Sequence, residues 1–174
     1  MRATLFNFST QLKWQPAIEG GAVASAEDYL LCGMGGSALA GDLLTIGDPA
    51  ISLTVHRDYG LPSRIADSRA SMLIIISSFS GNTEETLDAY RAARETEHPL
   101  IVITTGGELL ARARRDGIPQ IIIPDVTIQP RLAIGYFLKA LTLVTGTKTI
   151  GSELETLADR LDLAALEIEG RELA

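Results

Sequence analysis

Apolar residues in this chain gather in five short runs, and the stretches that follow most of them have helical spacing. The runs lie at residues 29–33, 51–55, 72–76, 100–103 and 120–123. Nearly unbroken apolar runs are typical of strands that are covered on both faces, which indicates a parallel sheet. Helical spacing predicts helices at residues 38–46, 83–95, 108–115, 131–144 and 152–169.

Strands that alternate with helices predict a doubly wound α/β fold, with helices on both faces of a five-stranded parallel sheet. In flavodoxin-like folds of this kind the common strand order is 2-1-3-4-5, so the first and third strands are neighbours. The chain changes direction between them, and ligands bind outside the carboxyl ends of the strands at that point. We therefore expect the loops after the first and third strands to form the functional site.

The composition narrows the range of functions. A net charge of -7, with no cluster of Lys or Arg, argues against a nucleic-acid surface. No apolar run approaches the ~20 residues of a membrane span, and the N-terminus lacks the apolar core of a signal peptide. One cysteine, Cys32, and two histidines give no metal constellation. We expect no metal, no membrane contact and a cytoplasmic location.

The third predicted strand leads into a loop that is rich in hydroxyl groups, residues 77–83, hereafter the serine loop. It reads Ser-Ser-Phe-Ser-Gly-Asn-Thr. Ser78, Ser80 and Thr83 supply hydroxyl donors, Gly81 permits a tight turn, and the helix that follows offers free N–H groups. The loop has no Lys or Arg, so these donors would hold an anion such as phosphate. The alternative is an ordinary helix start with Thr83 as N-cap.

A glycine turn, Gly-Met-Gly-Gly-Ser at residues 33–37, follows the first predicted strand. The expected strand order places it beside the serine loop, and we interpret the two as one anion pocket. Residues 33–38 also fit the dinucleotide fingerprint G-x-G-x-x-G/A, and Asp58 lies where a ribose-binding acid is expected. That hypothesis leaves the serine loop without a role, so a dinucleotide-binding domain is the minor alternative.

Four segments resemble one family of proteins. Residues 77–86 resemble the signature of sugar isomerase (SIS) domains. Residues 32–42, 57–62 and 129–136 are similar to the bifunctional phosphoglucose/phosphomannose isomerases of that family, and the four segments occur in the same order. The resemblance implies the flavodoxin-like SIS fold, a phosphorylated sugar as ligand and no redox cofactor. The sugars would be fructose 6-phosphate, glucose 6-phosphate and mannose 6-phosphate.

The resemblance also implies roles for single residues. The phosphate would be bound near the backbone of Gly36 and by the hydroxyls of Ser37, Ser78, Ser80 and Thr83. Arg131 would stabilise the enediolate in an aldose–ketose isomerisation through a cis-enediol. A fixed guanidinium opposes the negative charge that develops on oxygen during proton transfer between C1 and C2.

Relative to this family, the second of two SIS domains is absent. The family's base glutamate, ring-opening histidine and late lysine belong to that second domain. His56 and His98 do not match the family histidine, while Glu84 and Glu85 lie at a helix start, where acids favour the helix dipole. We expect a phosphate site without acid–base machinery. The chain is then either part of an isomerase or a non-catalytic sugar-phosphate sensor or regulatory subunit.

The expected organisation is an N-terminal arm or short helix over residues 1–28, the SIS domain over 29–146 and a C-terminal helix over 147–174. The apolar residues of the last segment are spaced three or four apart, which makes a narrow seam for helix packing. They are Leu154, Leu157, Leu161, Ala164 and Ile168. The seam either covers the chain's own sheet or packs on a second SIS domain or a second copy. We expect a homodimer centred on residues 131–145 or 152–169.

Overall fold

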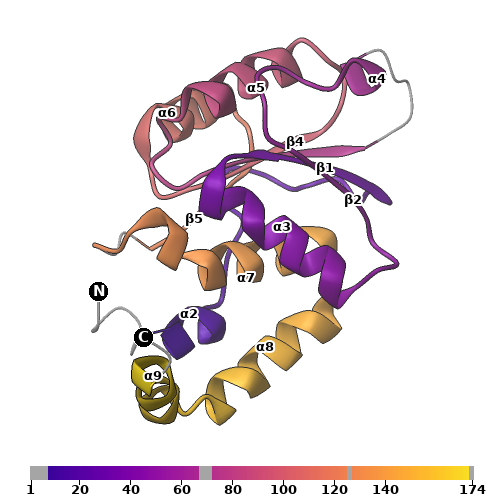
Figure 1. The fold of residues 1–174 in the computed structure, drawn as a ribbon. Coiled ribbons are helices and arrows are strands. Elements are labelled where there is room, and N and C mark those ends of the chain that lie inside the picture. Colours follow the sequence, from indigo (N-terminus) through magenta and orange to yellow (C-terminus); the bar gives the residue numbers. More distant parts are fainter. Residues whose placement is uncertain (1–7, 67–71, 125–126, 173–174) are drawn as a thin grey trace.

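The computed structural model describes residues 8–66, 72–124 and 127–172 of the chain. Five parallel strands form one sheet in the order β2-β1-β3-β4-β5 (Figure 1). They are β1 (Asp28–Gly33), β2 (Ser52–His56), β3 (Leu73–Ser78), β4 (Leu100–Thr104) and β5 (Gln120–Ile122). The predicted fold class and strand order are confirmed, and β1 and β3 are neighbours at the centre of the sheet.

Helices cover both faces of the sheet (Figure 1). One face carries α4 (Ser63–Ala66), α5 (Glu84–Arg94) and α6 (Gly107–Arg115). The other face carries α3 (Gly35–Gly47) and α7 (Ile134–Thr145). Beyond α7 lies an outer group of helices, namely α2 (Phe8–Lys13), α8 (Lys148–Arg160) and α9 (Leu163–Glu172). Of the helices that the structure describes, none combines the length and apolar composition that crossing a membrane requires.

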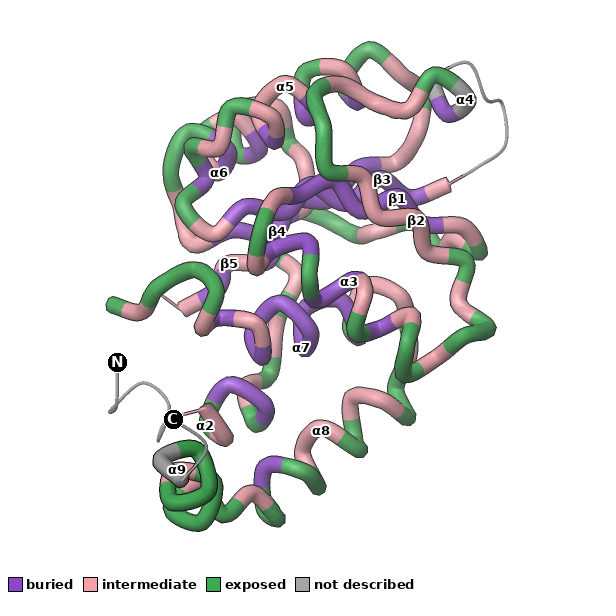
Figure 2. Tube along the Cα trace, in the orientation of Figure 1, coloured by how far each residue is buried: buried purple, intermediate pink, exposed green. Residues whose placement is uncertain are grey.

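The sheet separates two apolar cores, because successive side chains of a strand point to opposite faces. Leu31 and Ile75 pack toward α3 and α7, whereas Leu30 and Ile74 pack toward α5 and α6. All residues of β3 and β4 are buried, as expected of strands covered on both sides (Figure 2). Cys32 is also buried, as predicted, and burial raises the pKa of its thiol to about 12.

Two helices begin differently from the prediction. The helix after β1 begins at Gly35 rather than at residue 38, so the expected glycine turn is largely the first turn of α3. The helix expected at residues 131–144 is a 3-10 turn, η1 (Pro130–Leu132), followed by α7. Pro130 has no N–H and a fixed φ, which suits a helical start but not a helix interior. Arg131 therefore lies on a tight turn that precedes the α-helix.

The C-terminal segment forms two helices where one was expected. Leu161 is extended, with φ -67° and ψ 110°, which ends α8. Asp162 Oδ1 then accepts the N–H groups of Ala164 (3.1 Å) and Ala165 (3.0 Å), as an N-cap does at the start of a new helix. The predicted seam is covered only in part within the described chain. Leu154 packs against the core, whereas Leu157 is 46% exposed and Ile168 is 60% exposed.

A polar contact holds α8 to α7 and to the segment after α2. Lys139 is buried on α7, where it is the only charged residue, and its Nζ lies 2.6 Å from Glu155 Oε1 on α8. Gln15 Nε2 donates to the same oxygen at 2.8 Å. The hydrogen bond from Lys139, followed by that from Gln15, lowers the pKa of Glu155. A buried charge that loses its partner is strongly destabilising, so this contact anchors α8.

We predict that acid weakens the attachment of α8. Because the pKa of Glu155 is lowered in the folded state, its stabilising effect is complete above the ordinary glutamate pKa. The effect is lost as the pH falls through the folded-state value. Glu155→Gln should therefore lower the melting temperature at neutral pH, and its difference from wild type should shrink on acidification. Thermal unfolding at several pH values measures this, with exposed Glu153→Gln on the same helix as the control. An equal melting temperature for Glu155→Gln and wild type at neutral pH would contradict it.

Candidate functional site

The ends of β1 and β3 bring the two expected loops together. Gly33 of β1 pairs with Ser77 of β3, and a Cβ added to Gly33 would lie only 2.8 Å from the Ser77 carbonyl oxygen. The start of α3 and the serine loop therefore leave the sheet side by side. Ser37 Oγ accepts the N–H of Phe79 at 3.1 Å, and Ser77 Oγ donates to the Ser37 carbonyl at 3.4 Å. The predicted proximity of the two loops is confirmed.

Three serine hydroxyls at this end of the sheet are held in the same way, each accepting a backbone N–H. They are Ser37 with Phe79 (3.1 Å), Ser78 with Gly81 (3.1 Å) and Ser80 with Asn82 (3.2 Å). A hydroxyl has two lone pairs and one proton, so a hydroxyl that accepts in this way keeps its O–H for another partner. Ser37 and Ser78 are buried and Ser80 is exposed, so these donors extend from the interior to the surface.

Thr83 stands at the N-cap of α5, but its side chain does not cap the helix. Its Oγ1 lies 3.0 Å from Ser78 Oγ instead, which ties the two ends of the serine loop together. Met34 at the N-cap of α3 gives no side-chain cap either. Two helix starts therefore offer N–H groups that no capping side chain occupies. Thr83 is therefore the N-cap residue, as the alternative predicted, but its side chain makes no cap bond.

Arg131 lies against the start of α3. A Cβ added to Gly36 would be 2.9 Å from both Arg131 Cα and the Pro130 carbonyl oxygen, so the absence of a side chain lets η1 come this close. The Arg131 side chain is exposed and has no ion pair or hydrogen bond with any residue that the structure describes. The structure thus places Arg131 beside Gly36, while no contact joins its guanidinium to the serine hydroxyls.

The buried side chain of Gln11 holds this turn in place. Gln11 Nε2 donates to the Leu132 carbonyl at 2.8 Å, and Gln11 Oε1 accepts the N–H of Gly135 at 3.1 Å. Both ends of one amide thus bridge η1 and α7 from the N-terminal helix α2. We expected an arm or short helix over residues 1–28 and assigned no role to Gln11. A single glutamine in a short helix gives no local sign of a partner so distant in the sequence.

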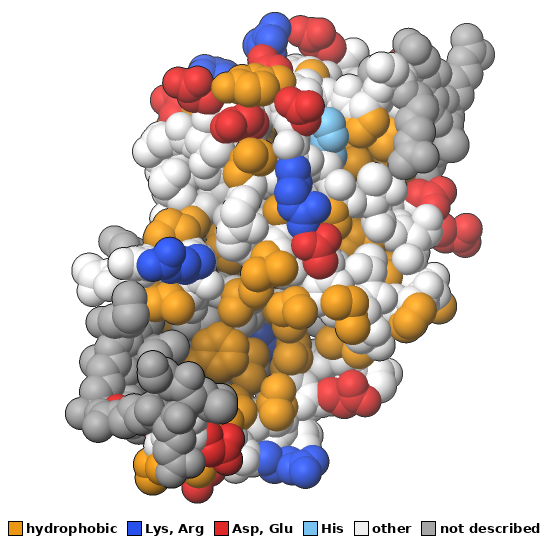
Figure 3. Space-filling model, in the orientation of Figure 1, with side chains coloured by type: hydrophobic (Ala, Val, Ile, Leu, Met, Phe, Trp, Pro, Cys, Tyr) orange, Lys and Arg blue, Asp and Glu red, His pale blue; other side chains and the backbone are white. Residues whose placement is uncertain are grey.

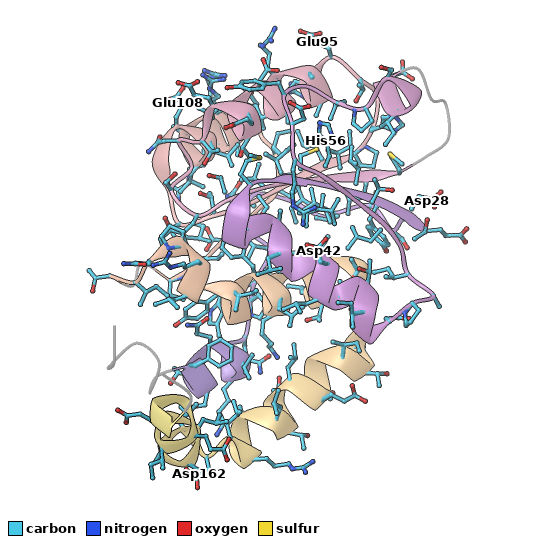
Figure 4. The ribbon with its side chains drawn as sticks, viewed as in Figure 1. Asp28, Asp42, His56, Glu95, Glu108 and Asp162 are labelled. Atoms are coloured by element: carbon cyan, nitrogen blue, oxygen red, sulfur yellow. The ribbon has the colours of Figure 1, made fainter. Side chains whose placement is uncertain are left out.

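The histidines are not part of this site. His56 Nε2 lies 3.4 Å from the Tyr59 carbonyl, and His98 Nε2 lies 3.3 Å from the Ile65 carbonyl. Figure 4 shows His56 at the α5 side of the sheet, opposite Asp42 on α3. Asp58, the expected ribose-binding acid of a dinucleotide site, accepts the N–H of Tyr59 at 2.8 Å. Across residues 8–66, 72–124 and 127–172, no group of His, Cys, Asp or Glu could hold a metal ion.

Glu84 and Glu85 lie in the first turn of α5, next to Tyr59. Tyr59 Oη donates to Glu84 Oε2 at 3.5 Å. The charge of Glu85 is the largest cause that raises the pKa of Tyr59, followed by partial desolvation and the charge of Glu84. Negative charge at a helix start favours the dipole. These glutamates therefore have the structural role that the sequence analysis gave them.

The chain resembles known proteins over much of its length, although no protein-family model matches it. It is 42% identical over 146 residues to the bifunctional phosphoglucose/phosphomannose isomerase of Caldicellulosiruptor bescii, covering 78% of this chain and 41% of that protein. It is 33% identical over 174 residues to the protein of the same name from Aeropyrum pernix, covering 96% of this chain and 51% of that protein. The chain thus spans about half the length, or less, of these relatives.

The fold also occurs among solved structures. Tagatose-6-phosphate ketose/aldose isomerase from Escherichia coli aligns with a TM-score of 0.58 at 20% identity, over 97% of this chain and 47% of that one. At this identity the likeness concerns the fold alone. It agrees with the five-stranded parallel sheet and its strand order.

We predict that the Thr86 hydroxyl costs stability. Thr86 is 1% exposed on the first turn of α5, and its Oγ1 has no hydrogen-bond partner among the described residues. Because an unpaired buried polar group is destabilising, Thr86→Val should raise the free energy of unfolding by about 1 kcal/mol. Urea unfolding measures this.

The matched control is Thr142→Val on α7. Thr142 is also buried, but its Oγ1 donates to the Lys139 carbonyl at 2.8 Å. Losing that bond should lower the free energy of unfolding by about 0.5–1.5 kcal/mol. If both variants lose stability equally, Thr86 has a partner after all, and the prediction is wrong.

Proposed function

Because this chain is an SIS-domain protein related to the bifunctional phosphoglucose/phosphomannose isomerases, of which it spans part, we propose that it binds the phosphate group of a phosphorylated sugar. The proposed site lies between the serine loop and the start of α3. The observation that carries the proposal is the set of three serine hydroxyls that accept backbone N–H groups and keep their own protons to donate. Phosphate oxygens are charged acceptors, for which such donors are well suited.

The proposed phosphate ligands are the hydroxyls of Ser37, Ser78, Ser80 and Thr83, together with the backbone at Gly36. Ser78 and Thr83 share one proton in their mutual hydrogen bond, which leaves the other for the ligand. The starts of α3 and α5 add free N–H groups and the positive ends of two helix dipoles. An anion at this position gains from both without any ammonium or guanidinium group in the serine loop.

We propose that Arg131 acts at the sugar end of the ligand. Its close approach to Gly36 supports this role, since it brings a cation without a partner in the described chain to the same helix start. Aldose–ketose isomerisation moves a proton between C1 and C2 and develops negative charge on oxygen. A guanidinium near that oxygen lowers the energy of the enediolate.

The isomerisation itself is proposed for the complete protein rather than for this chain alone. In the relatives' class of reaction, fructose 6-phosphate is exchanged with glucose 6-phosphate or mannose 6-phosphate through a cis-enediol. A general base within reach of C1 and C2 is needed for this step. No hydrogen bond connects His56 or His98 to the serine loop in the described chain, and Glu84 and Glu85 lie in the first turn of α5. The second candidate is therefore a sugar-phosphate sensor or regulatory subunit without catalysis, and a dinucleotide-binding domain stays the minor alternative.

We also propose that an apolar face of the chain meets a second copy or a second SIS domain. Figure 3 shows apolar side chains gathered over α3 and toward α8. The exposed large apolar residues of these helices and of α7 are Leu39, Leu43 and Ile46 on α3, Leu143 on α7 and Leu157 on α8. A contiguous apolar surface is typical of an interface. The homodimer expected from the sequence stays a prediction. The exposed residues of α3 extend the predicted interface to this helix.

We predict that Ser80→Ala/Thr83→Ala weakens the binding of fructose 6-phosphate at least tenfold. Each lost hydrogen bond to a charged group is worth about 1.5–3 kcal/mol. Isothermal titration calorimetry measures the affinity. Ser152→Ala/Thr156→Ala, which removes two exposed hydroxyls of α8, is the matched control and should bind as wild type does. Unchanged affinity in the site variant, or tighter binding of NAD than of sugar phosphate, would refute the proposed site.

We predict that the isolated chain binds fructose 6-phosphate but does not turn it over. A coupled assay for glucose 6-phosphate with the purified chain should give no rate above background, because we identify no general base for the proposed site among the described residues. If a polypeptide that carries a second SIS domain restores activity, Arg131→Ala should depress kcat more than it raises KM. An ordinary isomerase rate from the isolated chain would show that a base exists within it or in a second copy.

A further inference from the structure

Four hydrogen bonds join the serine loop to the loop that precedes α6 and to the first turn of that helix. Thr105 donates twice to the Phe79 carbonyl, from its N–H (3.2 Å) and from its Oγ1 (2.6 Å). The N–H of Leu109 donates to the Gly81 carbonyl at 2.9 Å, and the N–H of Glu108 donates to Asn82 Oδ1 at 3.0 Å. The last two bonds engage the first turn of α6.

Asn82 and Gly81 cap α6 from outside that helix. Gly106, at the N-cap of α6, has no side chain and makes no cap bond. The first N–H groups of a helix have no partner within it and need acceptors from elsewhere. Here one acceptor is a backbone carbonyl and the other is the side chain of Asn82. The start of α6 is therefore occupied by the serine loop, whereas no capping side chain occupies the starts of α3 and α5.

Glycine makes this contact possible on both sides. Gly81 has φ +68°, and a Cβ there would lie 1.9 Å from the Gly106 carbonyl oxygen. Gly107 has φ +69°, and its Cβ would lie 2.3 Å from the Ser80 carbonyl oxygen and 2.9 Å from Asn82 Oδ1. The two loops thus touch backbone to backbone. A shift of α6 relative to the sheet would move the residues on either side of Asn82.

We propose that Asn82 is a positioning residue for phosphate binding, an inference that rests on the proposed function. Its side chain holds α6, while its own N–H donates to Ser80 Oγ at 3.2 Å and orients that hydroxyl. Thr83 follows directly in the chain. The Oδ1 contact with α6 therefore fixes the backbone between two of the proposed phosphate ligands. A ligand gains affinity from a site that is ordered before it binds.

The coupling between the ligand and α6 is reciprocal. If the capped start of α6 favours the binding-competent serine loop, phosphate at that loop stabilises the capped start of α6 to the same extent. Phosphate should therefore slow amide hydrogen exchange at Glu108 and Leu109, whose N–H groups make the two capping bonds. A side chain that only stabilised the fold would not connect these two amides to the ligand.

The test combines calorimetry with inorganic phosphate and hydrogen exchange on the full chain. Asn82→Ala should bind phosphate about fivefold more weakly, which corresponds to the ~1 kcal/mol of a lost helix cap. It should also abolish the slowing of exchange at Glu108 and Leu109 by phosphate. Asn82→Asp keeps the acceptor and should keep these two amides protected, even though its charge opposes the anion.

Asp162→Ala is the matched control. The side chain of Asp162 also caps a helix, here as the residue directly before α9, at the opposite end of the molecule from Glu108 (Figure 4). It should lower stability and leave phosphate affinity within twofold of wild type. The inference is overturned if Asn82→Ala binds within twofold of wild type, if Asp162→Ala loses as much affinity, or if Asn82→Asp leaves the two amides unprotected. No binding by wild type would instead refute the proposed function.

Discussion

The pairing of β1 with β3 is the constraint on which the rest of this structure depends. Gly33 and Ser77 stand side by side at the ends of these strands, so close that a Cβ on Gly33 would clash with the Ser77 carbonyl. This register brings the start of α3 against the serine loop and lets Ser37 accept the N–H of Phe79. Hydroxyl groups from two separate crossovers thereby lie at the same end of the sheet, which is the arrangement that the proposed phosphate site requires.

The proposed anion site is built from neutral donors, in a chain whose net charge is -7. The backbone fixes the serine hydroxyls by donating to them, and each hydroxyl can then donate outward. Selectivity in such a site comes from hydrogen-bond geometry rather than from net charge. Arg131 supplies a cation only at the margin, where η1 touches α3, and that position fits a charge that develops during reaction better than one that anchors the phosphate.

The helix starts on either side of the serine loop are used differently. The start of α5 keeps its N–H groups free because Thr83 turns its hydroxyl to Ser78. The start of α6 is occupied by Gly81 and Asn82. One helix therefore serves the proposed ligand, and the next serves the loop that would hold it. Gln11 has a comparable supporting role for the turn that carries Arg131.

The sequence by itself determined the five strands, their order and the two loops of the candidate site. Those features follow from the spacing of apolar residues and from the positions of glycine and hydroxyl residues. Both are local signals, because they depend only on residues that are close in the sequence. Only the tertiary structure decided the partner of Thr83, the capping of α6 by Asn82 and the contact of Arg131 with Gly36. It also decided that Asp162 begins a new helix. A polar side chain such as Thr83 or Asn82 can bond several partners, and a turn can pack against several segments. Which partner is used depends on which segment the fold brings within reach.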